Sequence, residues 1–189
     1  DYILLYSDDK IEELRNKLLS VKEFCFDTET TGLGFIDNKL VGMSFSVKEF
    51  EAFYVPVSQD LDEAKLLLDK FRPVFESENI TKIAQNIKFD MMVLAVYGIQ
   101  VKGSLFDTMI AHYLLQPDQR HNMDFLAEVF LGYKTISYEE LVGPKGRNQK
   151  NIFEVFEEDP KRVVDYAAED ADITLRLKNI FKKDLESNK

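Results

Sequence analysis

The sequence predicts an α/β protein, and three observations lead to this fold class. Three apolar, strand-like runs lie close together in the first third of the chain, and stretches with helical spacing then alternate with short strand-like runs. From Lys161 to about Leu185 the chain keeps helical spacing without glycine or proline, which predicts a long final helix. The 189 residues are 45% hydrophobic, so we expect residues 1–189 to form one compact domain with a sizeable core.

The first elements expected are one helix and three strands. Residues 8–20 place Ile11, Leu14 and Leu18 at helical spacing behind two aspartates, which suit a helix N-terminus. The run VKEFCFDTE (21–29) predicts a buried strand, and KLVGMSFSV (39–47) and AFYVPV (52–57) predict two more. Because short connections join these runs, we expect an antiparallel meander.

The later elements are mostly helical. AKLLLDKFRPVF (64–75), KFDMMVLAVYG (88–98), DTMIAHYLL (107–115) and NMDFLAEVFLG (122–132) have helical spacing, and ITKIAQN (80–86) predicts a short strand. Asp107 is expected to cap the helix beginning at Thr108, with a supporting role near Asp90 as the alternative. His112 is interpreted as a packed histidine. The final helix begins with Asp159-Pro160, an acid followed by proline at the first helical position.

Composition limits the classes of function. No run approaches the ~18 apolar residues of a membrane span, no signal-peptide pattern opens the chain, and the single cysteine, Cys25, lies in a predicted strand. We therefore expect a soluble, cytoplasmic protein without membrane partners. The formal charge of −10 argues against broad, sequence-independent clamping of a nucleic-acid duplex. The chain begins DYILLYSDDK without an initiating methionine, so we expect a segment of a longer chain.

Four acids and one tyrosine are the candidate catalytic residues. Asp27 and Glu29 alternate along a buried strand, so both side chains project from one face about 7 Å apart. Buried carboxylates need a compensating cation, and oxygen ligands suit Mg²⁺ or Mn²⁺. Asp90 follows a short strand in the first turn of a helix, where an acid is also an ordinary partner of the helix dipole. Tyr166 and Asp170 share one face of the last helix.

Two neighbouring acids are interpreted differently. Glu169 and Asp172 point away from the face that carries Asp170, and we expect them to be solvated surface acids.

The ordered set DTET (27–30), NIKFD (86–90) and YAAED (166–170) resembles the three motifs of the DEDD exonuclease superfamily, in its tyrosine-containing branch. The resemblance is closest to the 3′→5′ proofreading domain of bacterial family A DNA polymerases, the DNA polymerase I family. It extends through FDTMIAHYLL, RHNMDFLAE and KTISYEELVGPKGRNQ between the second and third motifs. It implies a ribonuclease H-like fold: a mixed five-stranded sheet, with an antiparallel meander and parallel strands, flanked by helices.

The same resemblance implies the roles of individual residues. Asp27, Glu29, Asp90 and Asp170 would hold two divalent cations, Mg²⁺ or Mn²⁺, and Tyr166 would place the attacking water. Leu33 matches a wedge position and Tyr138 an aromatic that packs on the terminal nucleotide. The other expected substrate contacts are Thr28, Gln85, Asn86 and Tyr166; the loop bases Lys145, Arg147 and Lys150 would contact phosphates or remain solvated.

We therefore expect a metal-dependent 3′→5′ exonuclease that releases nucleoside monophosphates from single-stranded or frayed DNA ends. Its partners would be a DNA 3′ end and the polymerase domain of the same parent chain, in the bacterial cytoplasm near the nucleoid. Two alternatives stay open: a 3′→5′ exoribonuclease of the ribonuclease D type, and a catalytically silent domain that positions DNA.

Overall fold

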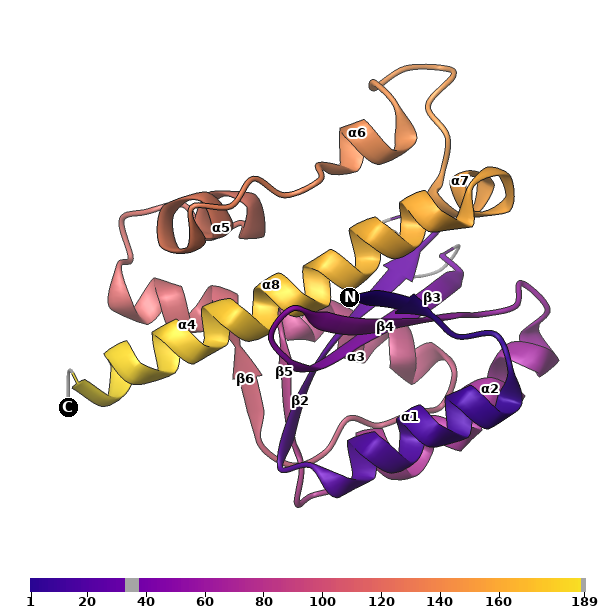
Figure 1. Ribbon diagram of the computed structural model, residues 1–189, viewed down its shortest axis with the longest axis horizontal. Helices are drawn as coiled ribbons and strands as arrows, with labels where there is room; N and C mark the ends of the chain where they lie inside the picture. Colours follow the sequence, from indigo (N-terminus) through magenta and orange to yellow (C-terminus); the bar gives the residue numbers. More distant parts are fainter. Residues whose placement is uncertain (33–37, 188–189) are drawn as a thin grey trace.

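The computed structural model, which describes residues 1–32 and 38–187, consists of a mixed sheet with helices on both faces (Figure 1). The strands are β1 (Tyr2–Leu4), β2 (Glu23–Thr30), β3 (Leu40–Lys48), β4 (Glu51–Pro56), β5 (Thr81–Ala84) and β6 (Leu105–Asp107). The helices are α1 (Asp8–Ser20), α2 (Leu61–Phe75), α3 (Ile87–Val96), α4 (Thr108–Leu115), α5 (Met123–Leu131), α6 (Tyr138–Val142), α7 (Ile152–Glu158) and α8 (Pro160–Ser187).

The strand order is β1-β4-β3-β2-β5-β6. The pairs β2–β3 and β3–β4 are antiparallel, which confirms the predicted meander, whereas β1–β4, β2–β5 and β5–β6 are parallel. The α/β class is therefore confirmed, but within the described residues the sheet has six strands rather than the five expected. The difference is the edge strand β1, which pairs Tyr2–Leu4 with Ala52–Tyr54 and is too short to show an alternating pattern in the sequence.

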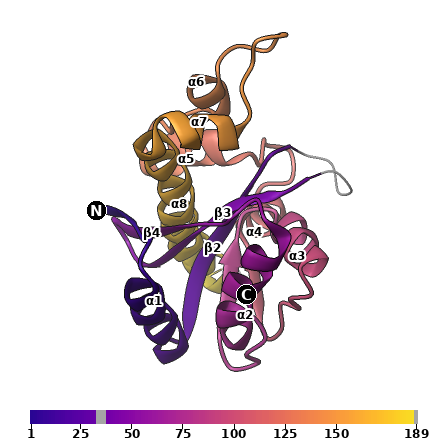
Figure 2. The same ribbon diagram turned by 90° about the vertical axis from the view of Figure 1, so that its right-hand side faces the viewer.

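Each face of the sheet buries its own core. On one face α1, α2 and α3 cover a cluster of phenylalanines that includes Phe24, Phe26 and Phe45 (Figure 2). The rings of Phe45 and Phe71 stack with centroids 5.2 Å apart. On the other face α8 lies across the sheet. Cys25, as expected, is a buried core residue there, packed with Ile83 and Leu175. Consecutive β2 residues therefore point alternately toward α2 and toward α8.

Helix α8 is buried on more than one side, and this overturns one expectation. Ala168 and Ala171 are fully buried in a cluster with Ala52 of the sheet, and their small side chains permit a close approach of the helix. Glu169 and Asp172, predicted to be solvated, are 2% and 1% exposed. Asp172 accepts hydrogen bonds from the Tyr2 hydroxyl (3.1 Å) and the Phe50 amide (2.6 Å). The prediction was wrong because β1, the turn between β3 and β4, and the segment before α6 also cover this helix.

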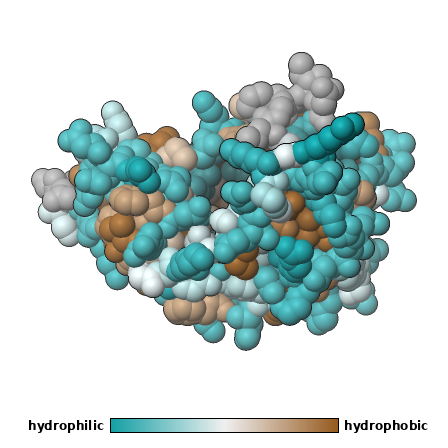
Figure 3. All heavy atoms as spheres, turned by 90° about the horizontal axis from the view of Figure 1, so that it is seen from above, coloured by the Kyte–Doolittle hydropathy of each residue, from teal (hydrophilic) through white to brown (hydrophobic). Residues whose placement is uncertain are grey.

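One face of the molecule is mostly polar. The face seen from above carries predominantly hydrophilic residues, with hydrophobic ones gathered in separate patches (Figure 3). No helix within residues 1–32 and 38–187 is both long and apolar enough to cross a bilayer.

His112, expected to be packed, is fully buried against Phe130 and Phe181.

One ion pair joins α8 to β2. Lys178 Nζ, on a side chain only 3% exposed, donates to Glu23 Oε1. From Lys178 to Asp170 the helix rises about 12 Å, and from Glu23 to Asp27 the strand advances about 13 Å. The pair therefore fixes the position along the helix axis at which Asp170 faces Asp27.

Replacing Glu23 by glutamine should lower the free energy of unfolding by about 2 kcal/mol, because it leaves the Lys178 ammonium buried without its counter-ion. Denaturant unfolding measures this value. The matched control is Glu13→Gln, which breaks the pair with Lys10 whose side chains are 60% and 65% exposed; this change should have an effect below about 0.5 kcal/mol. Equal losses in the two variants would contradict the role given to the α8–β2 pair.

Candidate active site

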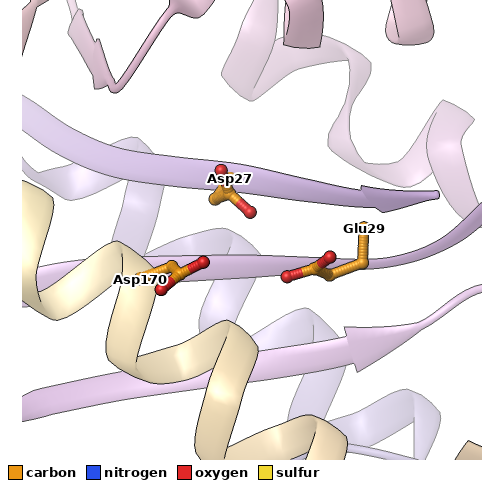
Figure 4. Close-up of side chains that lie close together, drawn as sticks. All are labelled: Asp27, Glu29 and Asp170. Carbon is orange, nitrogen blue, oxygen red and sulfur yellow. The ribbon is translucent and has the colours of Figure 1, made fainter. Parts of the chain in front are cut away.

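Three carboxylates from two elements meet on the α8 face of the sheet. Asp27 and Glu29 project from β2, and Asp170 projects from α8 toward them (Figure 4). Each residue offers one carboxylate oxygen, and these three oxygens all lie within 4.8 Å of one another. The strand alternation and the helix position described above are what bring the three groups together.

Two of the three carboxylates have an oxygen without a hydrogen-bond partner among the described residues. Glu29 Oε1 and Asp170 Oδ1 are buried, and no described residue donates a hydrogen bond to either atom. Burial, followed by the charge of Asp90, raises the pKa of the Glu29 carboxyl to about 8. Burial and the charges of their neighbours also raise the pKa of Asp27 and of Asp170 well above the ordinary range. A divalent cation would supply the missing partner, and an all-oxygen donor set fits Mg²⁺ or Mn²⁺.

Asp90 approaches from the opposite side of β2. The pairing of β2 with β5 ends at Cys25 and Ile83, and beyond that point Asp90 Oδ1 accepts hydrogen bonds from Thr28. The Thr28 amide donates at 3.0 Å and its hydroxyl at 2.6 Å. Asp90 is only 2% exposed, and burial, then the Asp27 charge, raises its pKa. Asp90 is thus electrostatically linked to the three carboxylates but is held in place by Thr28.

Asp107 supports the helix that carries Asp90. Its carboxylate accepts hydrogen bonds from the amides of Asn86 (3.1 Å) and Ile87 (3.0 Å) at the start of α3, and from the Met109 amide (2.9 Å) at the start of α4. The predicted cap on α4 is confirmed. The same side chain also caps α3. The residue before this helix, Asn86, has a left-handed backbone conformation with φ 61°. One carboxylate therefore satisfies donors at two helix N-termini.

Two tyrosines stand beside the carboxylates. Tyr166 lies one turn before Asp170 on α8, and its ring centroid is 6.5 Å from that of Tyr138, the first residue of α6. Burial, followed by the Asp170 charge, raises the pKa of the Tyr166 phenol, so the hydroxyl keeps its proton at neutral pH. Tyr166 can therefore donate a hydrogen bond in the site but is unsuited to act as a base.

These groups line a cleft of about 620 Å³, a size typical of small-molecule sites. Lys145 and Gln149, from the basic loop between α6 and α7, also line it. Lys150 instead pairs with Glu158, while Arg147 is exposed. The full lining consists of Asp27, Thr28, Glu29, Thr30, Gly32, Phe89, Tyr138, Lys145, Gln149, Tyr166 and Asp170.

The other expected substrate contacts have different outcomes. Leu33 falls outside the described residues. Gln85 and Asn86 are not among the residues that line the cleft. The Gln85 amide donates to the His121 carbonyl (2.7 Å), and its oxygen accepts from Thr108. Thr28 lines the cleft, although its hydroxyl already donates a hydrogen bond to Asp90.

Strand β3 supplies further residues next to the carboxylates, which were not predicted from the sequence. Ser44 faces Asp27 across the sheet, and Gly42 faces Glu29. A side chain at Gly42 would collide with the Tyr54 hydroxyl, which would lie 2.1 Å from a Cβ atom. The Ser44 and Tyr54 hydroxyls are buried, and no described residue forms a hydrogen bond with either. Their small, polar or aromatic side chains resemble ordinary strand residues, so the sequence carried no signal for them.

Comparison with known proteins gives a consistent result. A family model described as 3′-5′ exonuclease matches residues 2–186. The chain is 40% identical over 185 residues to DNA polymerase I of Borreliella burgdorferi, covering 96% of this chain and 19% of that protein. It is 35% identical over 196 residues to DNA polymerase I of Pseudomonas aeruginosa, covering 99% and 21%. The chain therefore spans about one fifth of the length of these relatives.

Solved structures share the fold at low identity. The catalytic core of RRP6 from Trypanosoma brucei matches with a TM-score of 0.73 and 22% identity, over 98% of this chain and 47% of that one. Brucella melitensis NrnC matches with a TM-score of 0.70 and 23% identity, over 89% and 76%. These likenesses confirm the ribonuclease H-like architecture.

The raised pKa of Glu29 predicts how stability depends on pH without metal. Between about pH 4.5 and pH 8 the folded protein keeps a proton on Glu29 that the unfolded chain releases, so this group destabilises the fold increasingly as the pH rises. In the presence of a chelator, Glu29→Gln should therefore be more stable than the unchanged protein at pH 8, by at least about 1.4 kcal/mol. The difference should shrink toward pH 5. Urea unfolding at the two pH values measures it.

The exposed Glu157 gives the control. Glu157→Gln should change stability little at either pH. A Glu29→Gln variant whose stability relative to the unchanged protein is the same at pH 5 and pH 8 would contradict the proton uptake assigned to Glu29.

Proposed function

The chain belongs to the 3′-5′ exonuclease family represented in bacterial DNA polymerase I, and from this premise we propose that it is a metal-dependent 3′→5′ exodeoxyribonuclease. It would release nucleoside monophosphates from single-stranded or frayed DNA 3′ ends. Residues 1–189 would form one proofreading domain of a longer chain whose polymerase domain is its partner. The setting would be replication and repair at the nucleoid, in the bacterial cytoplasm.

One observation carries the proposal: Glu29 Oε1 and Asp170 Oδ1 are buried with no hydrogen-bond donor among the described residues, beside Asp27, in a cleft large enough for a nucleotide. Three carboxylates so close together are stable as anions only when a cation joins them. Asp27, Glu29 and Asp170 would hold one divalent cation, and Asp90 would contribute to a second beside Asp27. When bound, such ions polarise the phosphodiester and lower the pKa of water.

The chain's own residues would then bind and orient the substrate. The Tyr166 hydroxyl would donate a hydrogen bond that aims the attacking water, because its raised pKa keeps it protonated. The Tyr138 ring would stack on the terminal base without reading its identity. Lys145, on the cleft wall, would pair with a backbone phosphate and offset part of the chain's formal charge of −10.

DNA is the preferred substrate because the relatives at 35–40% identity are DNA polymerases. The second candidate is a 3′→5′ exoribonuclease of the ribonuclease D type, whose members share the tyrosine-containing motif. A silent, DNA-positioning domain is disfavoured, because all four motif acids are present. An enzyme that rejects RNA must exclude the 2′-hydroxyl from its cleft.

Asp27→Asn should reduce shortening of a 5′-labelled single-stranded DNA by about a thousandfold or more, equivalent to about 4 kcal/mol of lost transition-state stabilisation. The amide keeps the side-chain volume but cannot bind the cation as a carboxylate does. Gel analysis of the 3′ digestion ladder, with Mg²⁺ and with chelator, measures the effect. The control is Asp165→Asn, since Asp165 pairs with Lys161 at the surface of α8.

The same ladder is run with a ribo-oligonucleotide of identical sequence. The proposal expects the DNA to be shortened faster, and only with metal. It fails if Asp27→Asn retains near-normal activity or if chelator leaves the ladder unchanged. Faster shortening of the RNA would establish the exoribonuclease instead.

A further inference from the structure

Another buried acid of α8 lies next to the candidate metal ligand Asp170. Glu169 directly precedes Asp170 and is only 2% exposed, yet its hydrogen-bond donors are neutral. The Tyr133 hydroxyl donates to Glu169 Oε1 at 2.6 Å, and the Ile136 amide donates to Oε2 at 2.7 Å. Burying a carboxylate is costly unless such hydrogen bonds compensate it. The two bonds therefore hold the segment 133–137 firmly against the helix.

This segment, which we call the strap (residues 133–137), forms neither helix nor strand. Its middle is also fixed, because the Thr135 hydroxyl donates to Asp124 Oδ1 of α5 at 2.7 Å. Its end, Ser137, caps α6 through reciprocal hydrogen bonds with Glu140. The strap thus leads from α5 into the first turn of α6, and the carboxylates of Glu169 and Asp124 hold it in place.

The two ends of α6 are held in different ways. At its C-terminal end Leu141 and Val142 are buried, and Arg162 of α8 donates to the carbonyls of Glu140 (3.0 Å) and Leu141 (2.9 Å). At its N-terminal end Tyr138 is 44% exposed at the cleft, and its ring meets Tyr166 edge-on. The position of Tyr138 therefore depends mainly on the strap.

We propose that Glu169 is a positioning residue: its carboxylate clamps the strap to α8 and thereby fixes the Tyr138 ring over the cleft, beside Tyr166. The inference rests on the proposed function in one respect, that Tyr138 contacts the terminal nucleotide. Consecutive residues on a helix point about 100° apart, and Glu169 is not among the residues whose oxygens approach one another in the carboxylate cluster. Glu169 is consequently not a ligand of the metal, and its main effect is on substrate binding through Tyr138.

Hydrogen exchange measured by mass spectrometry tests the clamp without any assay of activity. In Glu169→Ala the amides of the strap and of Tyr138 should exchange about tenfold faster, as expected for losing hydrogen bonds to a charged group. Glu169→Gln should restore most of the protection, because its oxygen can still accept from Ile136 while the Tyr133 hydroxyl accepts from the amide. The control is Glu157→Ala, a surface acid of α7.

Kinetics and metal binding then test the route through Tyr138. On single-stranded DNA, Glu169→Ala should raise KM about tenfold, and calorimetric Mn²⁺ affinity should stay within about twofold of the unchanged protein. The double variant Glu169→Ala/Tyr138→Ala should have the same KM as Tyr138→Ala alone, since each change removes the contact of Tyr138 with the terminal nucleotide.

Unchanged exchange in the strap would overturn the clamp. A loss of Mn²⁺ affinity with unchanged KM, or additive effects in the double variant, would overturn the route through Tyr138. If Glu169→Ala does not fold, Tyr133→Phe and Thr135→Val decide, because each must raise exchange in the strap and KM together. A protein that never shortens DNA would refute the proposed function while the exchange result still decides the clamp.

Discussion

Mutual repulsion among the carboxylates of Asp27, Glu29 and Asp170, of which the last two are buried, is the constraint on which the rest of the structure depends. Their oxygens lie within 4.8 Å of one another, and two of those residues have buried oxygens that no described residue satisfies. A flexible chain would relieve this repulsion by moving the carboxylates apart. In the folded protein the alternative is to protonate them, as their raised pKa values indicate. Keeping them together therefore requires rigid elements on both sides, and a cation is the partner that turns the repulsion into attraction.

The fold meets this requirement by fixing the elements rather than the individual side chains. β2 lies inside the sheet, paired with β3 and β5, so it cannot shift without disrupting both neighbours. Helix α8 is fixed along its length, by alanines against the sheet and by the ion pair of Lys178 with Glu23. Asp107 fixes the start of α3 and with it Asp90. Each functional carboxylate is thus carried by an element that neighbouring segments hold in place.

The sequence could predict what depends on local periodicity. Alternation along a strand placed Asp27 and Glu29 on one face, and a four-residue helical spacing aligned Tyr166 with Asp170. It could not predict what depends on packing between distant segments. Thr28 binds Asp90 because β5 ends before β2 does, which no local pattern reports. Glu169 was predicted to be exposed because helical periodicity describes one buried face, whereas the strap covers a second. The three-residue strands β1 and β6 and the short helices α6 and α7 were missed for lack of length.

The central claim is that the carboxylate cluster is a site for divalent cations, and anomalous diffraction from crystals grown with Mn²⁺ tests it most directly. The account predicts a peak at about 2.0–2.3 Å from Glu29 Oε1 and Asp170 Oδ1, with Asp27 also in coordination, and a second peak beside Asp27 when a nucleotide is bound. Peaks elsewhere on the protein, or a cluster free of manganese at millimolar concentration with nucleotide in the cleft, would contradict it.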